Sequence, residues 1–302
     1  MKIAAVLMIK NEADIIEFFI RLNAKYFDSF YLLDHYSCDG TAKIIAKLQS
    51  EGFPITYRHL TERVYDQSKI ITSEVRRIAA DAKYRYIMPI DADEFIHAKS
   101  PEVFRHVLEE NITPNQIGHI PMATYCPIKS DYFNTPSPLY CNFRMREFEP
   151  RQYFKVIVGG AFAKKCIIPM GSHSADQFWR KSKSNPLPDI LIQHVPVRSQ
   201  EQIIRKAILG SYALKCNKNR KIYEGFHWDS IADFIRRNNY IISESQLFEI
   251  AISYAAKKGD ILPTRVLESS PRIGYSGDIV KYKEFSGIDL IKSLDHALLK
   301  ST

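Results

Sequence analysis

The sequence lacks several short motifs and long runs that would assign it to a specialised class of protein. Its five cysteines are odd in number and far apart, with no CxxC pair, so neither a zinc cluster nor a disulfide framework is indicated. The phosphate-binding patterns GxxxxGK[ST] and GxGxxG are also missing, which excludes a P-loop or a dinucleotide-binding Rossmann site. No stretch reaches the ~18 uninterrupted apolar residues of a membrane-spanning helix. A reducing compartment suits such a chain best, and we expect a cytoplasmic protein.

Charge is unequally divided between the two signs. The 42 Lys and Arg outnumber the 34 Asp and Glu, for a formal net charge of +8. The cations are spread along the chain and form no basic run, so we expect no nucleic-acid partner. A surplus of this kind favours phosphate-bearing ligands, or peripheral contact with the anionic inner face of a membrane. The apolar run from Ile3 to Ile9 is followed at once by Lys10-Asn11-Glu12 and no cleavage site, so it predicts a buried strand, not a secretion signal.

The first hundred residues alternate between strand-like and helix-like periodicity. Such alternation predicts βαβ units, and therefore an α/β fold with a mostly parallel sheet flanked by helices. The expected strands are residues 3–9, 30–34, 53–59 and 86–90, and the expected helices are residues 15–26, 41–48, 67–83 and 101–108. The middle of the chain is irregular and punctuated by proline, with strands expected at 119–125, 153–162 and 190–194. Capping boxes at Ser199 and Ser243 then begin a helical C-terminal region, which includes an amphipathic segment at 288–299.

An acidic triplet, Asp91-Ala92-Asp93, follows the fourth expected strand and is itself followed by Glu94. In parallel α/β sheets ligands bind beyond the carboxyl ends of the strands. A bend there would let one carboxylate bind Mg²⁺ or Mn²⁺, which prefer oxygen ligands, while the other acts through water or on a ribose. The alternative is a solvated acidic turn, and the position after a buried strand favours the metal site.

Two further polar segments follow strands at the same predicted edge. Asp34 ends the second strand and is suited to accept hydrogen bonds from a base or ribose. In the turn that follows, Asp39 and Gly40 are expected to be architectural, because Asp-Gly-Thr is common as a turn and helix cap. Lys10-Asn11-Glu12 follows the first strand, and it suits either a nucleotide or a solvated helix start.

These three segments together resemble the family-2-type glycosyltransferases with a GT-A fold. The likeness lies in the order Val6 to Glu12, then Leu33-Asp34-x-x-Ser37-x-Asp39-Gly40-Thr41, then Ile90-Asp91-Ala92-Asp93-Glu94-Phe95, similar to the branch with an "LDADEF" motif. Pro89-Ile90 departs mildly from the Leu-Leu more usual there. A later segment, 193–199 with Glu201, resembles that branch's His-x-x-x-Arg-Ser-x-Glu. The likeness covers about residues 1–210.

The resemblance implies a metal-dependent transfer of a sugar from a UDP- or GDP-linked donor to a glycan or lipid-linked acceptor, with Mn²⁺ or Mg²⁺ as cofactor. It implies a catalytic domain over 1–198, with a nucleotide-binding half at 1–110 and an acceptor and metal half at 111–198, and a helical extension over 199–302. Most relatives invert the anomeric centre. A bacterial surface polysaccharide or lipopolysaccharide pathway is the hypothesis for the acceptor. The implied metal ligands are Asp91, Asp93 and one of His194 and His173; the implied donor-binding residues are Lys10, Asn11, Glu12, Asp34, Asp91, Lys155 and Arg198; and the base candidates are Asp131 and Asp176.

Two other interpretations stay open from the sequence. A sugar nucleotidyltransferase shares the architecture and needs a metal, but it usually has a glycine-rich first loop, and Lys10-Asn11-Glu12 has no glycine. A non-catalytic carbohydrate-binding protein with a degenerate fold is disfavoured by the presence of both Asp91 and Asp93.

Overall fold

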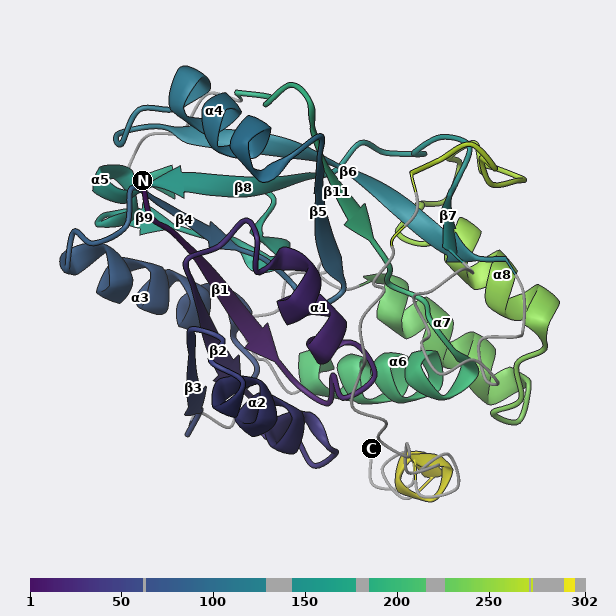
Figure 1. Cartoon of the computed structure of the whole chain (residues 1–302). Helices are drawn as coiled ribbons and strands as arrows, with labels where there is room; N and C mark the ends of the chain where they lie inside the picture. Colours follow the sequence, from purple (N-terminus) through teal and green to yellow (C-terminus); the bar gives the residue numbers. More distant parts are fainter. Residues whose placement is uncertain are drawn as a thin grey trace. The chain divides into compact units, whose positions relative to one another are not determined.

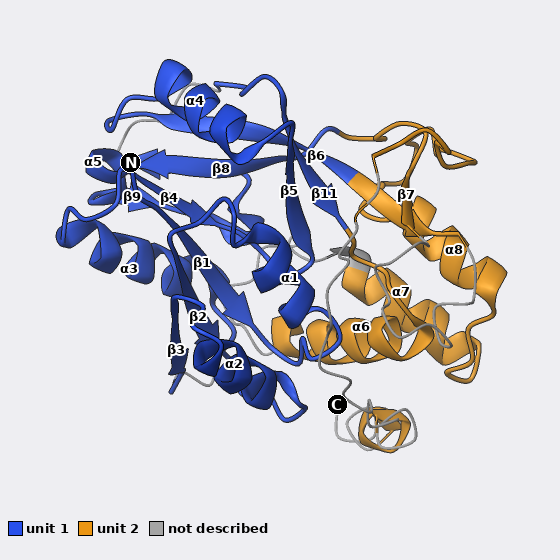
Figure 2. Ribbon diagram, in the orientation of Figure 1, with its two compact units in different colours: residues 1–123, 152–194, 275–282 blue, residues 124–151, 195–274, 283–302 orange. Residues whose placement is uncertain are grey.

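The computed structural model describes residues 1–61, 64–128, 143–177, 185–215, 226–271, 273 and 291–296 (Figure 1). These residues form two compact units (Figure 2). Unit 1 takes in Met1–Ala123 and Gln152–His194, and unit 2 takes in Thr124–Arg151 and Val195–Gly274. The boundaries of the predicted catalytic domain and its functional halves stay a prediction.

Unit 1 begins with a parallel sheet in the order β3-β2-β1-β4. Its strands are β1 (Ile3–Ile9), β2 (Ser29–Asp34), β3 (Ile55–His59) and β4 (Tyr86–Pro89), and the connecting helices are α1 (Ile16–Asn23), α2 (Thr41–Ser50) and α3 (Gln67–Ala80). The predicted α/β fold, with a parallel central sheet flanked by helices, is confirmed. The apolar runs predict β1 and β4 because these strands are buried on both faces, whereas β3 at the edge of the sheet is largely exposed.

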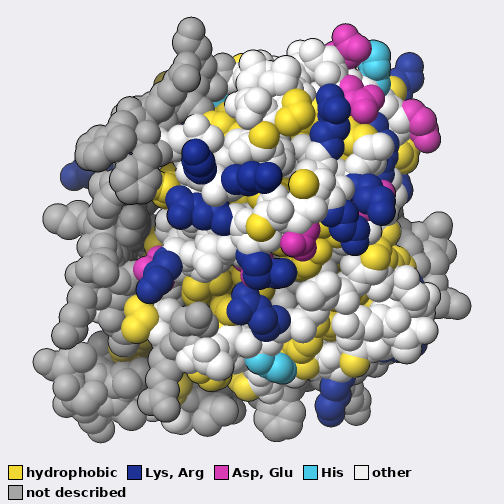
Figure 3. Space-filling model, turned by 90° about the vertical axis from the view of Figure 1, so that its left-hand side faces the viewer, with side chains coloured by type: hydrophobic (Ala, Val, Ile, Leu, Met, Phe, Trp, Pro, Cys, Tyr) yellow, Lys and Arg dark blue, Asp and Glu magenta, His cyan; other side chains and the backbone are white. Residues whose placement is uncertain are grey.

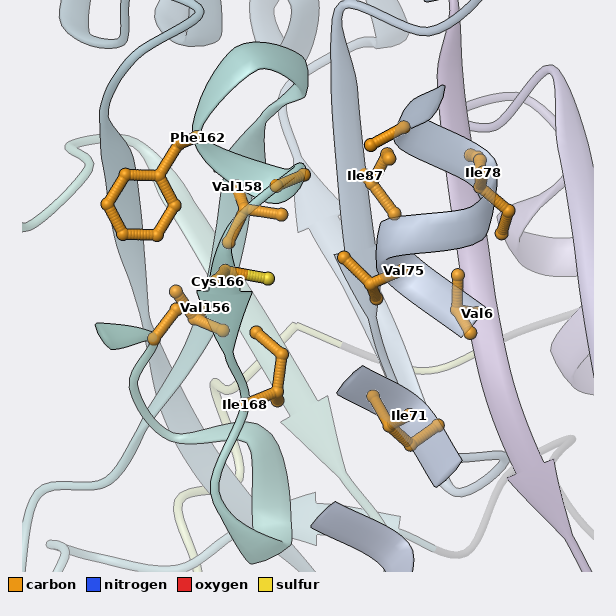
Figure 4. Close-up of a cluster of buried hydrophobic side chains, with 14 of the residues drawn as sticks. Val6, Ile71, Val75, Ile78, Ile87, Val156, Val158, Phe162, Cys166 and Ile168 are labelled. Atoms are coloured by element: carbon orange, nitrogen blue, oxygen red, sulfur yellow. The ribbon is translucent and has the colours of Figure 1, made fainter. Parts of the chain in front are cut away.

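The core of unit 1 lies between α3 and one face of the sheet (Figure 4). Ile71, Val75 and Ile78 share one side of α3, where they meet Val6 of β1 and Ile87 of β4. Successive side chains of a strand point to opposite faces, so Ala5 and Leu7 of β1 serve the other face of the sheet. All five of these side chains are buried. Their packing holds β1 and β4 in place, and these strands are followed by Lys10-Asn11-Glu12 and by the acidic triplet.

The sheet continues beyond β4 with antiparallel strands, which the alternation rule did not predict. The order is β4-β8-β6-β11-β5, and β7 pairs with β6. The added elements are α4 (Pro101–Asn111), β5 (Glu94–Ala98), β6 (Ile117–Pro127), β7 (Phe143–Met145), β8 (Phe154–Gly159), α5 (Gly160–Ala163), β9 (Cys166–Ile167), β10 (Asp176–Gln177) and β11 (Ile190–His194), with a 3₁₀ turn at Met170–Ser172. The expectation of a helix through residue 83 and a strand through residue 162 was wrong: α3 ends at Ala80, and β8 gives way to α5 at Gly160. The strand β5 was missed altogether.

Unit 2 is mainly helical in its described part. Its helices are α6 (Gln200–Lys215), α7 (Phe226–Arg237) and α8 (Glu244–Ile252), and residues 291–296 are also helical. The predicted capping box at Ser243 is confirmed, with Gln246 as its partner. A core of apolar side chains from all three helices holds the unit together, including Ile204, Ile235 and Ile250.

Charge is unevenly distributed over the face of unit 1 that carries α3, α5 and β9. Lys and Arg side chains gather there, with few carboxylates between them (Figure 3). Exposed cations of these elements and of the segments that follow them are Lys69, Arg77, Lys83, Arg85, Lys164 and Lys165. The residues described include no helix both long and apolar enough to cross a bilayer.

Candidate functional site

Asp34 lies at the carboxyl end of β2 with its side chain fully buried. Its Oδ1 accepts a hydrogen bond from the backbone N–H of Ser37 at 2.8 Å, and its Oδ2 accepts one from the Tyr57 hydroxyl at 2.5 Å. His59 Nδ1 lies 3.8 Å from the same Oδ2. Burial and the hydrogen bond to Asp34 raise the pKa of Tyr57, so its hydroxyl stays protonated and donates. Asp34 is thereby fixed in one orientation at the edge of the parallel sheet.

The loop after β1 is tied to the loop after β2 by backbone hydrogen bonds. The N–H groups of Asn11 and Glu12 donate to the hydroxyls of Ser37 and Thr41, each at 2.9 Å. The Asn11 side-chain oxygen in turn accepts from the N–H of Cys38 at 2.8 Å. Asn11 has φ of 56°, in the left-handed region that asparagine tolerates better than most residues. Asn11 therefore joins the two loops, in addition to its predicted place beside a nucleotide.

The turn that contains Asp39 has the architectural contacts expected of it. Asp39 Oδ1 accepts from the N–H and the hydroxyl of Thr41, the first residue of α2, and its Oδ2 accepts from the N–H of Ala13. Asp39 thus caps α2 and fixes the loop after β1 with one carboxylate.

The acidic triplet forms a turn between β4 and β5. The chain enters it beside β1, where the N–H of Ile90 donates to the Val6 carbonyl at 3.0 Å. Since β1 separates β4 from β2, Asp91 and Asp34 leave the sheet two strands apart, which is about 10 Å across the strands. The turn sends the two aspartates to different partners.

Asp91 is held by a closed set of hydrogen bonds. Lys155 Nζ lies 2.6 Å from Asp91 Oδ2 and 2.8 Å from Glu94 Oε1, and it donates to the Gly171 carbonyl at 3.0 Å. Gln67 connects Asp91 to Gly171 by a second route. Its amide nitrogen donates to Asp91 Oδ1 at 3.3 Å, and its amide oxygen accepts from the N–H of Gly171 at 3.0 Å. The ring is completed within the turn, where the N–H of Asp91 donates to Glu94 Oε2.

The charge balance of this ring depends on Lys155, which is fully buried in β8. Burial alone would lower the pKa of Lys155, but the carboxylates of Asp91 and Glu94 raise it, so the amine stays charged. Burial also raises the pKa of Glu94 to about 8, against the opposing attraction of Lys155. The structure thus gives Lys155 a place among the carboxylates, where the sequence analysis expected it to bind donor phosphate.

Asp93 points toward β11 instead. Its Oδ1 lies 3.8 Å from His194 Nε2, and His194 is the register partner of Glu94 in the antiparallel pair of β11 and β5. Both side chains are largely buried, with 5% and 15% of their surface exposed. Asn23 of α1 fixes the strand on which this pair depends, because its side chain bonds both the Glu94 carbonyl and the N–H of Ile96. Asp93 and His194 therefore face each other and are held in place by the paired strands β5 and β11.

The other predicted site residues fall in different places. His173 bonds the Phe154 carbonyl through Nδ1 at 2.8 Å, and Asp176 lies in β10 opposite Ile167. Arg198 belongs to unit 2, where its side chain is buried and donates to the Val195 carbonyl at 3.4 Å. Asp131 lies outside the described residues.

Sequence analysis missed Asn23, Gln67 and Tyr57, and it missed the pairing of Glu94 with Lys155. Asn23 and Gln67 are ordinary polar residues at a helix end and a helix start, so nothing in the local pattern marks them. Lys155 did carry a signal, since it lies between Phe154 and the apolar run 156–158, and a charged residue within a buried strand needs a buried partner of opposite charge.

Comparison with known proteins yields structural likenesses only. No protein-family model matches the sequence, and no curated protein matches it. The chain is similar to S. aureus TarS in complex with UDP-GlcNAc, at 12% identity and a TM-score of 0.41, over 83% of this chain and 76% of that one. Full TarS is covered over only 46% of its length. It is also similar to the mannosyltransferase PcManGT from Pyrobaculum calidifontis in complex with GDP-Man and Mn²⁺, at 14% identity and a TM-score of 0.38, over 86% and 76% of the two chains.

A nucleotidyl-transfer enzyme also aligns with the chain. The 4-diphosphocytidyl-2C-methyl-D-erythritol synthase from Anaerococcus prevotii shares 14% identity at a TM-score of 0.32, over 53% of this chain and 70% of that one. All of these TM-scores lie below 0.5. The function of the chain therefore has to be argued from its own residues.

Proposed function

We propose that the chain is a metal-dependent glycosyltransferase that takes a sugar from a UDP- or GDP-linked donor. The observation that carries the proposal is the pair of Asp93 and His194, whose side chains are of the types that bind metal ions and lie close together. The pair lies beside the carboxyl end of β4, in the same parallel sheet as β2, which ends at Asp34. Ligands of open α/β sheets bind at this edge.

The donor atoms of Asp93 and His194 are close enough to bind one Mn²⁺ ion together, whereas Mg²⁺, which prefers oxygen ligands, would depend mainly on Asp93. Two ligands that each lie about 2.1 Å from one ion are at most about 4.2 Å apart, and the Asp93 Oδ1 to His194 Nε2 distance is 3.8 Å. Among the described residues no cluster of three or more His, Cys, Asp and Glu is arranged for a metal. Two protein ligands leave coordination positions for diphosphate oxygens, as is usual for these ions at phosphate sites. His194 is the better of the two histidine candidates, because its Nε2 lies 3.8 Å from Asp93 Oδ1.

When bound, the cation would neutralise charge on the diphosphate that leaves the sugar. The chain's own residues position the donor around it. Asp34 is the proposed hydrogen-bond acceptor for the ribose or base. Its buried carboxylate accepts from Ser37 and Tyr57 in this structure, so the donor would take the place of one of these partners. Lys10, Asn11 and Glu12 line the same edge, where the two loops are joined by the Asn11 bonds. Asp91 contacts the donor from the ring of hydrogen bonds that fixes it.

The acceptor side of the proposal rests on fewer observations. Transfer with inversion needs a carboxylate to deprotonate the acceptor hydroxyl, and Asp176 and Asp131 are the residues proposed for it. We further propose a glycan or lipid-linked acceptor in bacterial surface polysaccharide or lipopolysaccharide synthesis, at the cytoplasmic face of the membrane. The cations over α3, α5 and β9 support peripheral contact with that anionic face (Figure 3).

The test is a screen of UDP- and GDP-sugars for hydrolysis with Mn²⁺ on the wild type, Asp93→Asn and His194→Ala. Each substitution should lower the rate by on the order of a hundredfold or more, because each removes a group that organises charge stabilisation. Asp81→Asn is the matched control, since Asp81 is exposed and lies beyond the end of α3; its rate should equal that of the wild type. Unchanged hydrolysis in Asp93→Asn would remove Asp93 from the metal site.

The same screen separates the transferase from the two other interpretations. Release of pyrophosphate from a nucleoside triphosphate and a sugar phosphate would favour a nucleotidyltransferase. Carbohydrate binding without metal-dependent nucleotide binding would favour a non-catalytic protein.

A further inference from the structure

Two segments of unit 2 that are bonded to each other carry exposed apolar side chains. Ile261 is 79% exposed, its neighbour Leu262 is 47% exposed and Phe148 is 40% exposed. Single exposed apolar residues are normal on protein surfaces, but contiguous ones mark interaction sites. We call these three residues the apolar loop patch.

Ion pairs and backbone bonds hold the two segments of the patch side by side, next to β7 (Figure 1). The Arg151 guanidinium donates to Asp260 through Nε and Nη2, at 2.8 and 2.7 Å. The N–H of Glu147 donates to the Arg265 carbonyl at 3.0 Å, and the side chains of these two residues form a second ion pair at 2.8 Å. Phe148 and the Ile261-Leu262 pair therefore project from an ordered surface.

Two lysines precede the apolar pair in a tight turn. The N–H of Asp260 donates to the Lys257 carbonyl at 3.0 Å, and Asp260 Oδ2 accepts from the N–H of Lys257 at 2.8 Å. Gly259 has φ of 91°, a conformation that favours glycine at the third position of such a turn. Lys257 and Lys258 are both exposed, so cationic and apolar side chains follow each other directly on one loop.

We propose that the apolar loop patch inserts into the headgroup region of an anionic lipid bilayer. Apolar side chains at the acyl boundary, with lysines at headgroup level, are the pattern by which proteins lie on a membrane. The arrangement disfavours a second copy of the chain, because two like-charged lysine pairs would meet and three side chains are too few for a standard interface of about 800 Å² per partner. This deepens the membrane contact of the proposed function, but it requires no transfer activity.

Vesicle flotation of the full chain tests the proposal, with phosphatidylglycerol–phosphatidylcholine vesicles against pure phosphatidylcholine vesicles. The wild type should float with the anionic vesicles only. Ile261→Ser with Leu262→Ser should lower partitioning on the order of tenfold or more, through lost apolar burial. Lys257→Gln with Lys258→Gln should lower it about fivefold per charge, which corresponds to about 1 kcal/mol each. Ile241→Ser is the matched control, because Ile241 is 67% exposed elsewhere in unit 2; it should float like the wild type.

Three results would overturn the proposal. The first is equal recovery of the wild type with neutral and anionic vesicles, and the second is no recovery with either. The third is equal partitioning of Ile241→Ser and of the loop variant, Ile261→Ser with Leu262→Ser. Sedimentation velocity covers the alternative occupant: a dimer that becomes monomeric in the loop variant would assign the patch to self-association. Since no nucleotide is present, any of these outcomes leaves the transferase proposal standing.

Discussion

Replacing Lys155 by methionine should destabilise unit 1 strongly. Methionine keeps the length of the side chain but removes the charge, so Asp91 and Glu94 lose the cation at 2.6 and 2.8 Å. Removal of one partner of a buried ion pair costs about 3–5 kcal/mol. For a unit of this size, 1 kcal/mol shifts Tm by about 2–4 °C, so we expect Tm to fall by roughly 10 °C. Thermal unfolding followed by circular dichroism measures the shift.

The pH dependence gives this prediction a definite sign. Burial already raises the pKa of Glu94 to about 8 while Lys155 is present. In both proteins native Glu94 binds its proton more tightly than the unfolded chain does, so both lose stability as pH rises from the unfolded value near 4.3 toward 8. Without the cation the native pKa rises further, so the variant goes on losing stability above pH 8, where wild-type Glu94 has ionised. The difference in Tm between wild type and variant should therefore be larger at pH 9 than at pH 6.

Matched variants make the reasoning refutable. Lys164→Met makes the same substitution at an exposed site, and it should leave Tm within about 1–2 °C of the wild type. Adding Glu94→Gln to Lys155→Met should recover part of the loss above about pH 8, because it removes a group that would otherwise ionise there without a partner cation. A Lys155→Met protein as stable as Lys164→Met would show that Lys155 does not hold the acidic turn.

Three further predictions concern the framework. Asn23→Ala removes two buried hydrogen bonds to β5 and should cost about 2–4 kcal/mol, measured by urea unfolding; a loss below 1 kcal/mol would contradict the role given to this side chain. Gly171→Ala places a Cβ 2.6 Å from the His173 ring at φ of 80° and should cost about 1–3 kcal/mol by the same assay; full stability would show that the loop relaxes freely. Burial would raise the pKa of Asp295, but hydrogen bonds from Arg236 and two tyrosines lower it. Ionised Asp295 therefore stabilises the folded chain above the unfolded pKa near 3.9, and this stabilisation is lost as pH falls through the pKa of Asp295 in the folded chain. Asp295→Asn should therefore lower Tm at pH 7, and the difference from the wild type should shrink as pH falls below about 4; parallel Tm curves would refute the assignment.

The parallel half of the sheet was predictable because its signals are local. Apolar runs such as Ile3–Ile9 predict strands covered on both faces, and Ser100 with Pro101 predicts the start of α4. The strand β5 was missed because it begins with Glu94 and immediately follows an acidic turn. Its strand character comes from pairing with β11, almost one hundred residues later.

The candidate site divides in the same way. Asp34, Asp91 and Asp93 were identified from their position after apolar strands, which local sequence reveals. The partners that distinguish Asp91 from Asp93 come from distant segments, since Lys155 is 64 residues from Asp91. Only the antiparallel strands β8 and β11 bring Lys155 and His194 to the turn, so the different surroundings of the two carboxylates could not be predicted from the triplet.

Nucleotide binding with and without Mn²⁺ tests the central claim most directly. Isothermal titration of UDP and GDP into the wild type and Asp93→Asn compares the two proteins under the same conditions. The account predicts that the wild type binds one of the nucleotides with Mn²⁺ and weakly or not at all in EDTA, and that Asp93→Asn loses the metal-dependent part. Equal binding by both proteins, or wild-type affinity that does not change when Mn²⁺ is removed, would contradict it.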